Sequence, residues 1–229
     1  MVLAAGLGTR MRPLTDDRPK ALVEVGGKAL VDHALDRLVE AGVSHAVVNV
    51  HYFADALEAH LKARATPHIA ISDERALLLE TGGGIKKARP LLGEDPIFVA
   101  NIDSVWTENS PALKALADAW DPERMDALLL LAPLGQTLGF DGPGDFFRAE
   151  DGRLSHRGAA PSAPYAYVGF QIFKPQLVDG GPDGAPFSVF PSWMEAAHAG
   201  RLFGVVLDGF WMHVGDPEAR DAAEARLSA

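Results

Sequence analysis

Two kinds of apolar pattern alternate along the first half of the chain. Short continuous apolar runs, typical of buried strands, alternate with stripes of apolar residues three or four positions apart, typical of helices. The runs predict strands over 2–5, 46–50, 69–72 and 96–100, and the stripes predict helices over 30–41, 54–63 and 84–92. This alternation predicts an α/β fold with a doubly wound, mostly parallel sheet, because parallel strands need helical crossovers.

The second half has a less regular pattern with more turn residues. Asp151-Gly152 predicts the turn of one hairpin, and Asp208-Gly209 predicts a closing hairpin formed by 202–207 and 210–214. Asp216 and Pro217 are suited to the start of a last helix, as its N-cap and first residue. The remaining predictions are helices over 111–119 and 188–199 and strands over 126–131 and 166–175.

Composition and charge exclude several classes of protein. The net charge of −10 argues against a nucleic-acid partner, and the absence of cysteine excludes disulfides and thiolate metal sites. No apolar run is long enough to span a bilayer, and the first run ends at Gly6, too early for a signal peptide. No repeat or C-terminal β-helix pattern is present. We therefore expect a cytoplasmic protein with no membrane partner.

The N-terminal stretch holds the clearest candidate chemistry. Gly6 and Gly8 follow the first predicted strand, where glycines let backbone N–H groups approach a ligand. Arg10, Arg12 and Lys20 add positive charge to an otherwise acidic chain. Together these features favour a polyphosphate ligand.

Three phosphate-binding motifs compete for this stretch. A P-loop requires a Gly-Lys-Ser/Thr ending, which is absent, and a dinucleotide fingerprint requires a glycine or alanine where Met11 stands. The third pattern, L-A-A-G-x-G-T-R-x-R-P-L-T…P-K, runs from Leu3 to Lys20. By this pattern the chain resembles the sugar-1-phosphate nucleotidyltransferase family.

The resemblance implies one Rossmann-like nucleotidyltransferase domain over 1–229, with a nucleotide-binding half over 1–105 and a sugar-binding half over 106–229. Such a domain joins an NTP and a sugar 1-phosphate into an NDP-sugar and releases pyrophosphate. Leu-Leu-Glu-Thr-Gly-Gly-Gly and a downstream Gly-Asp-Phe are similar to the N-acetylmuramate-1-phosphate uridylyltransferases of cell-wall recycling. The mannose-1-phosphate guanylyltransferase branch is the alternative, and a non-catalytic nucleotide-binding subunit is a third hypothesis. A monomer or small homo-oligomer is expected.

Two further strand ends supply candidate ligand contacts. Three glycines from Gly82 precede a predicted helix and would let the backbone pack against a base, and Asp103 ends a buried strand, where it could hold Mg²⁺ on substrate phosphates. The resemblance implies that the nucleotide is bound by Leu3, Ala4, Ala5, Gly6, Gly8, Thr9, Arg10, Glu80, Gly82 and Gly83.

The resemblance also implies roles in catalysis and in sugar binding. Arg10 would hold the β- and γ-phosphates, and Lys20 would bridge the α-phosphate and the attacking group. Sugar contacts are expected from Asn101, Asp145 and Gly169. A carboxylate on the sugar would need a cation, for which the candidates are Arg148, Arg157, Lys174 and Arg201.

The chain departs from the family near its end. The family pattern resembles W-x-D-x-G-T-P, whose aspartate is the second carboxylate on Mg²⁺, whereas this chain has His213 in that place and Asp216 in place of the threonine. Either Asp216 takes over metal binding or it only caps the last helix while His213 faces the site. We favour the cap, because Asp216 directly precedes Pro217 and Glu218. His213 is then expected near the metal or phosphates, where it could hold a metal-bound water, since neutral imidazole is itself a poor Mg²⁺ ligand.

Overall fold

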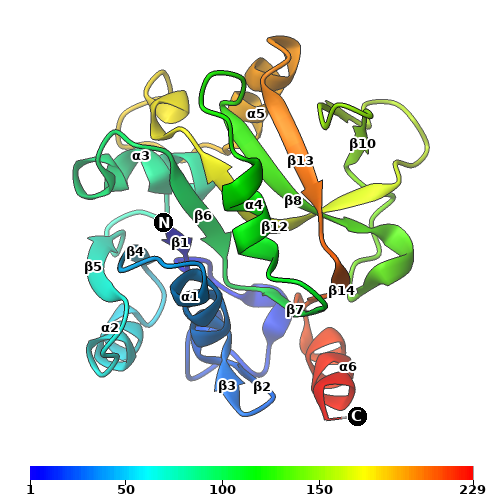
Figure 1. The fold of residues 1–229 in the computed structure, drawn as a ribbon. Helices are drawn as coiled ribbons and strands as arrows, with labels where there is room; N and C mark the ends of the chain where they lie inside the picture. The colour runs from blue at the N-terminus through cyan, green and yellow to red at the C-terminus, as the bar shows by residue number, and fades with distance from the viewer. Residues whose placement is uncertain (229) are drawn as a thin grey trace.

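The computed structural model describes residues 1–228, and a nine-stranded sheet forms its centre (Figure 1). The strand order is β11-β10-β12-β6-β1-β4-β5, with β8 paired to β12 and β13 paired to β8. The pairings make β11 and β12 run opposite to the other strands, so the sheet is mixed but mostly parallel, which confirms the predicted fold class. The strands are β1 (Val2–Leu3), β4 (His45–Val50), β5 (His68–Asp73), β6 (Ile97–Asn101), β8 (Ala127–Pro133), β10 (Phe146–Arg148), β11 (Leu154–His156), β12 (Tyr165–Phe173) and β13 (Leu202–Val206).

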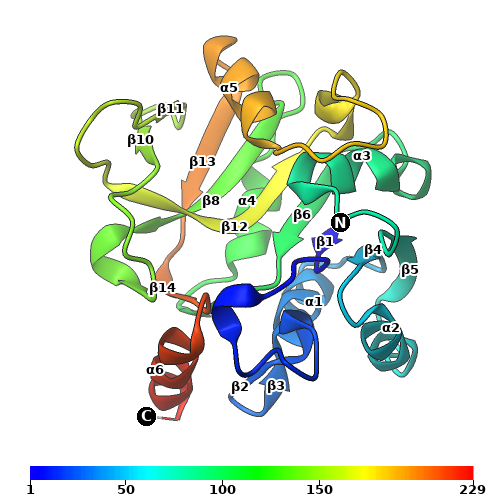
Figure 2. The ribbon, with the colours of Figure 1, turned by 180° about the vertical axis from the view of Figure 1, so that it is seen from behind.

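Helices cover both faces of this sheet because successive strand residues point to opposite faces. Leu128 and Leu130 pack with the apolar sides of α1, α2 and α4, whereas Leu129 and Leu131 pack with those of α3 and α5. Figure 1 looks onto the side of α1 and α4, and Figure 2 onto the side of α3 and α5. The helices are α1 (Leu30–Glu40), α2 (Ala54–Lys62), α3 (Glu80–Leu92), α4 (Ala112–Ala119) and α5 (Phe190–His198).

A smaller body of structure lies at one edge. β7 (Ser104–Glu108), β14 (Gly209–His213) and β9 (Thr137–Leu138) form a second sheet, and β2 (Glu24–Val25) pairs with β3 (Lys28–Ala29). α6 (Pro217–Leu227) packs beside β2, where the Gly26 amide donates to the Glu224 carboxylate at 2.8 Å. The last helix is thereby joined to the segment that connects β2 and β3.

The predicted closing hairpin of 202–207 and 210–214 is wrong. β13 joins the large sheet parallel to β8, and β14 joins the small sheet antiparallel to β7. Gly209 sits where its backbone approaches Thr107, since an added Cβ would lie 2.0 Å from the Thr107 carbonyl oxygen. The turn residues therefore mark a crossing from one sheet to another. The other predicted hairpin is present, because β10 and β11 pair around Asp151-Gly152.

The third predicted helix is longer than its sequence pattern indicated. α3 begins at Glu80 rather than at residue 84, and its first residue has a left-handed φ of 59°. The three glycines therefore lie inside the helix, although glycine is a poor helix former. Across residues 1–228 we find no helix with the length and apolar character needed to cross a membrane.

Candidate active site

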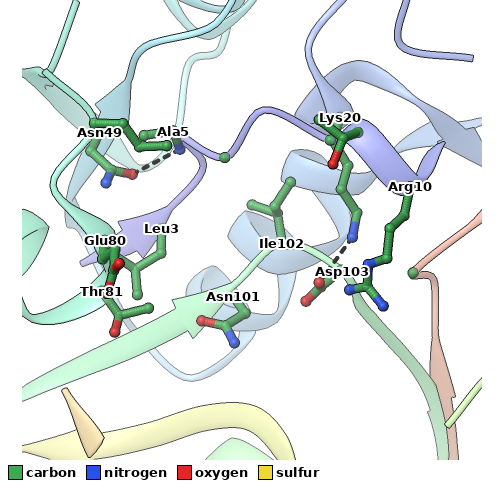
Figure 3. A pocket seen from close by; sticks show the side chains of 15 residues that line it. Leu3, Ala5, Arg10, Lys20, Asn49, Glu80, Thr81, Asn101, Ile102 and Asp103 are labelled. Carbon is green, nitrogen blue, oxygen red and sulfur yellow. Dashed lines mark hydrogen bonds and ion pairs between the residues drawn. The ribbon is translucent and has the colours of Figure 1, made fainter. Parts of the chain in front are cut away.

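A cavity of about 330 Å³ opens at the carboxyl ends of β1, β4 and β6 (Figure 3). Ligands of open α/β sheets bind at this edge. In Figure 3, Leu3, Asn49, Glu80 and Thr81 lie at one end of the cavity, and Arg10, Lys20 and Asp103 lie at the other. The lining brings together these predicted site residues: Leu3, Ala5, Gly6, Gly8, Thr9, Arg10, Lys20, Glu80, Asn101 and Asp103.

The glycine-rich loop after β1 presents free backbone donors to the cavity. Gly8 has a φ of 62°, and a Cβ there would lie 3.0 Å from the Lys20 Cβ and 3.1 Å from the Thr15 Cγ2. The Thr15 hydroxyl donates to the Gly8 carbonyl oxygen at 2.9 Å and holds the turn. Within residues 1–228 the amides of Gly6 and Gly8 donate no hydrogen bond, which leaves them available to an anion.

The amides of Ala4 and Ala5 are already used. Both donate to the Asn49 Oδ1, at 2.6 and 3.2 Å, and Ala4 does not line the cavity. Of the two alanines predicted to bind nucleotide, the structure thus brings only Ala5 to the cavity. Asn49 was not among the predicted site residues, although a polar residue near the end of a buried apolar strand could have indicated it.

Lys20 and Asp103 line the other end of the cavity, and His213 lies behind them against Asp103. The Lys20 Nζ lies 2.9 Å from the Asp103 Oδ2, and the His213 Nε2 lies 3.5 Å from the same oxygen. The side chains of Lys20 and Asp103 are 11% and 24% exposed, so the pair is shielded but still reaches the cavity. Figure 3 shows the guanidinium of Arg10 beside Asp103, and no protein acceptor binds it within residues 1–228.

The electrostatic environment keeps Asp103 ionised. Burial alone would raise the pKa of Asp103, but the charge of Lys20 and the hydrogen bond from His213 hold it well below its usual range. Burial alone would likewise lower the pKa of His213, but its hydrogen bond to Asp103 and the charge of that carboxylate raise it above its ordinary value. The His213 Nδ1 contacts the Gly139 carbonyl oxygen at 3.0 Å, which fixes the ring.

Asp216 caps α6. Its Oδ1 accepts a hydrogen bond from the Ala219 amide at 2.8 Å, and its φ of −150° is extended, as expected of an N-cap. Neither Asp216 nor His213 lines the cavity, although Gly215 between them does.

We expect Asp216→Ala to lower the free energy of unfolding by about 1 kcal/mol, because an N-cap side chain satisfies a helix amide that is otherwise unpaired. Asp216→Thr should lose less stability than Asp216→Ala, since threonine can also cap. Urea denaturation of the two variants beside the parent chain measures this. Equal stability of Asp216→Ala and the parent chain would contradict the capping role.

Four predicted ligand residues lie outside the cavity and have structural contacts. The amides of Gly82 and Gly83 both donate to the Phe187 carbonyl oxygen, and a Cβ on Gly82 would lie 2.5 Å from the Phe187 ring. Asp145 accepts the Tyr167 amide at 2.8 Å. Gly169, at a φ of 95°, lets β12 approach Asn101 and Ser104. These glycines allow close approach of protein segments to one another.

The four candidate cations for a sugar carboxylate are also outside the cavity. Lys174 and Arg201 both pair with Asp126, each at 2.9 Å. Arg148 donates to the Gly204 carbonyl oxygen, and Arg157 donates to that of Gly144. All four make their contacts with other residues of 106–229.

The side chains at this end of the cavity suit a metal ion that is bound partly by the protein and partly by substrate phosphates. Residues 1–228 contain no group of three or more histidine, aspartate or glutamate side chains able to share a metal ion. Asp103 is the one carboxylate at the charged end of the cavity within the described chain. Mg²⁺ commonly takes one or two protein carboxylates and completes its shell with water and substrate phosphates. Asp103 fits that requirement, and a cage made of protein alone does not form here.

Residues 1–143 match the MobA-like NTP transferase domain. The chain is 61% identical to the N-acetylmuramate alpha-1-phosphate uridylyltransferase of Caulobacter vibrioides, over the whole of this chain and 96% of that protein. It is 30% identical to the mannose-1-phosphate guanylyltransferase catalytic subunit beta of Xenopus tropicalis, over 95% of this chain and 61% of that protein. The chain thus matches nearly the full length of the first relative and a smaller part of the second.

A solved structure has the same fold. HddC of Yersinia pseudotuberculosis, crystallised with GMP-PN, superposes with a TM-score of 0.75 at 20% identity, over 99% of this chain and 97% of that one. At that identity the likeness establishes the fold alone.

Proposed function

The chain belongs to the MobA-like NTP transferase family, and on this premise we propose that it transfers a uridylyl group from UTP to N-acetylmuramic acid α-1-phosphate. The products are UDP-N-acetylmuramic acid and pyrophosphate. The 61% identity over the whole chain to a uridylyltransferase with this substrate carries the proposal. The predicted resemblance to the sugar-1-phosphate nucleotidyltransferases is confirmed by that relationship.

The arrangement of the cavity supports this class of reaction. A phosphate oxygen of the sugar 1-phosphate attacks the α-phosphorus of UTP, and the bond from that phosphorus to the pyrophosphate oxygen breaks. The nucleophile is already an anion, so no strong general base is needed. Catalysis then depends on aligning two anions and neutralising the charge that develops. Free loop amides and a cluster of cations at one end of the cavity can meet both needs.

We assign Arg10 to the β- and γ-phosphates and Lys20 to the α-phosphate. The unpaired guanidinium of Arg10 can bind two phosphate oxygens as a fork. Lys20 is anchored beside the loop at Gly8, and its ammonium group is a point charge at the same end of the cavity, 2.9 Å from Asp103. The other end of the cavity, lined by Leu3, Glu80 and Thr81, would then receive the base.

Mg²⁺ is the metal we assign to Asp103. When bound, it would neutralise charge on the α-phosphate and the product pyrophosphate. His213 lies near enough to hold a water in the shell of that ion. The carboxylate of Asp103 is ionised well below neutral pH and is therefore ready to accept a cation.

We also propose that residues 1–105 bind the nucleotide and residues 106–229 bind the sugar. All cavity residues except Gly215 lie within 1–105, as a nucleotide-binding half requires. The sugar is then expected between that half and residues 106–229, beside Asn101. A cytoplasmic monomer or small homo-oligomer acting in peptidoglycan recycling is consistent with this activity.

Pyrophosphate release from each of five NTPs with a panel of sugar 1-phosphates tests the substrates. We expect kcat/KM for UTP with N-acetylmuramic acid α-1-phosphate to exceed that of every other pair by about 100-fold, because a site that hydrogen-bonds its ligand rejects analogues that leave its groups unpaired. GTP with mannose 1-phosphate is the matched comparison. Preference for that pair would replace uridylyl transfer by guanylyl transfer, and binding of NTP without turnover of any pair would favour a regulatory subunit.

A further inference from the structure

Glu74 is a fully buried carboxyl group that the proposed mechanism does not use. It is 0% exposed and follows β5 directly. Its Oε1 accepts from the Asn49 Nδ2 at 2.7 Å, and its Oε2 accepts from the Leu79 amide at 3.0 Å. No Lys, Arg or His forms an ion pair with it within residues 1–228. Burying a carboxylate without a cation raises the free energy of the folded state, which indicates a role for Glu74 in its contacts.

Its partner Asn49 is 3% exposed and connects it to the glycine-rich loop. The amides of Ala4 and Ala5 are donors, so the Asn49 side chain must turn its oxygen toward them. Its nitrogen must then face an acceptor, and Glu74 supplies one. The Glu74 carboxylate can accept from both donors that face it, the Asn49 Nδ2 and the Leu79 amide. A glutamine has only one acceptor oxygen, so its NH₂ group would face one of these two donors.

The surrounding backbone leaves room for this pair and little else. A Cβ on Gly84 would lie 2.9 Å from the Glu74 Oε1 and 3.0 Å from the Asn49 Nδ2. Gly84 therefore lets α3 pack directly against the two side chains. The contacts join four segments: the loop after β1, the end of β4, the residue after β5 and the residue before α3.

We propose that Glu74 is a positioning residue for the nucleotide: it fixes the orientation of the Asn49 amide, which holds the Ala4-Ala5 backbone and so sets the loop of Gly6 to Arg10 at the cavity. Glu74 does not line the cavity and acts only through Asn49. The assignment of the loop to a nucleotide rests on the function proposed above.

An exchange of the two side-chain types tests the polarity of the network. Glu74→Gln places an amide nitrogen against a donor, and Asn49→Asp places one carboxyl against another. In the double variant the introduced amide can donate to the introduced carboxylate and accept from the Leu79 amide. The carboxylate can still accept from Ala4 and Ala5, so every donor again has an acceptor.

The readout is UTP binding by calorimetry without sugar phosphate, beside separate KM values for UTP and sugar 1-phosphate. Each single variant should weaken UTP binding by about tenfold and change the KM for sugar 1-phosphate by less than about threefold. The double variant should return to within about threefold of the parent chain. A merely structural carboxyl would not give this split or this rescue.

Glu108→Gln is the control for loss of a carboxylate far from the nucleotide. The Glu108 Oε2 also accepts two neutral donors, the Trp106 Nε1 at 2.7 Å and the Ala112 amide at 3.0 Å. Unlike Glu74 it also pairs with a cation, since its Oε1 lies 2.6 Å from the Arg37 Nη1, and it lies away from the cavity. This variant should be less stable yet bind UTP as the parent chain does. If the single variants do not fold, a folded double variant with parental UTP affinity supports the network, and an unfolded one overturns it.

Parental UTP affinity in both single variants, or a double variant no better than the weaker single one, also overturns the proposal. The binding measurement separates this result from that of the proposed function. A parent chain that binds UTP but transfers it to no sugar phosphate contradicts the transferase, while the affinities of the variants still decide the role of Glu74.

Discussion

Lys20→Ala is expected to lower kcat for uridylyl transfer by about three orders of magnitude, because removing one preorganised charge from a shielded site has effects of this size. The Lys20 Nζ, 2.9 Å from Asp103, is the cation best placed between the loop and the metal position. The fold should persist, since Lys20 begins the short helix η2 (Lys20–Leu22) in a loop and contributes little to the core. Steady-state kinetics with a melting curve measure both.

Arg18→Ala is the control for this substitution. Arg18 belongs to the same loop, but it is exposed and pairs with its neighbour Asp17. Its loss should leave kcat unchanged, so an effect confined to Lys20→Ala is due to position and not to the net charge of the loop. Unchanged turnover of Lys20→Ala would remove Lys20 from the mechanism.

Asp103→Asn, made in the parent chain, should lower kcat/KM by about 1,000-fold and raise the Mg²⁺ concentration needed for half-maximal activity. Asparagine keeps the volume of the side chain but removes the carboxylate charge, so the change separates charge from packing. Mn²⁺ binding to the UTP complex, followed by electron paramagnetic resonance, gives a readout besides activity. It should weaken in this variant.

Two other substitutions should change the Mg²⁺ requirement differently from Asp103→Asn. His213→Asp adds a second carboxylate beside Asp103 and should lower the Mg²⁺ requirement, whereas Asp216→Thr should leave it unchanged because Asp216 binds the Ala219 amide. Loss of metal binding in a folded Asp216→Thr variant would show instead that Asp216 is a ligand. Full Mg²⁺-dependent activity of Asp103→Asn would exclude Asp103 as the metal residue.

Sequence periodicity predicted the strands and helices that alternate regularly along the first half of the chain. The parallel half of the sheet follows from apolar runs alternating with helical stripes, and the motif from Leu3 to Lys20 supplies seven of the fifteen residues that line the cavity. The closing hairpin failed for a physical reason. A turn signal at Asp208-Gly209 indicates a reversal of the chain but does not say which sheet each strand joins, because that depends on distant partners such as Leu131 and Thr107.

Glycines were the least predictable residues of the site. Gly82, Gly83 and Gly169 are predicted to admit a ligand, and in the structure they lie close to Phe187, Asn101 and Ser104. A missing side chain indicates that something approaches closely, and the sequence cannot say whether the neighbour is ligand or protein. The position of Asn49 near the end of a buried strand could have indicated a polar contact, but its partners Ala4 and Glu74 could not be predicted because they lie far along the chain.

The position of Gly215 in the sequence determines when the cavity can become complete during synthesis. It lines the cavity beside Arg10, whose guanidinium nitrogen would lie 3.6 Å from a Cβ on Gly215, and it follows β14 near the end of the chain. A ribosome synthesises the glycine-rich loop well before it reaches this wall of the cavity. The growing chain therefore has the loop long before it has a complete pocket, and the pocket is complete only once synthesis has passed Gly215.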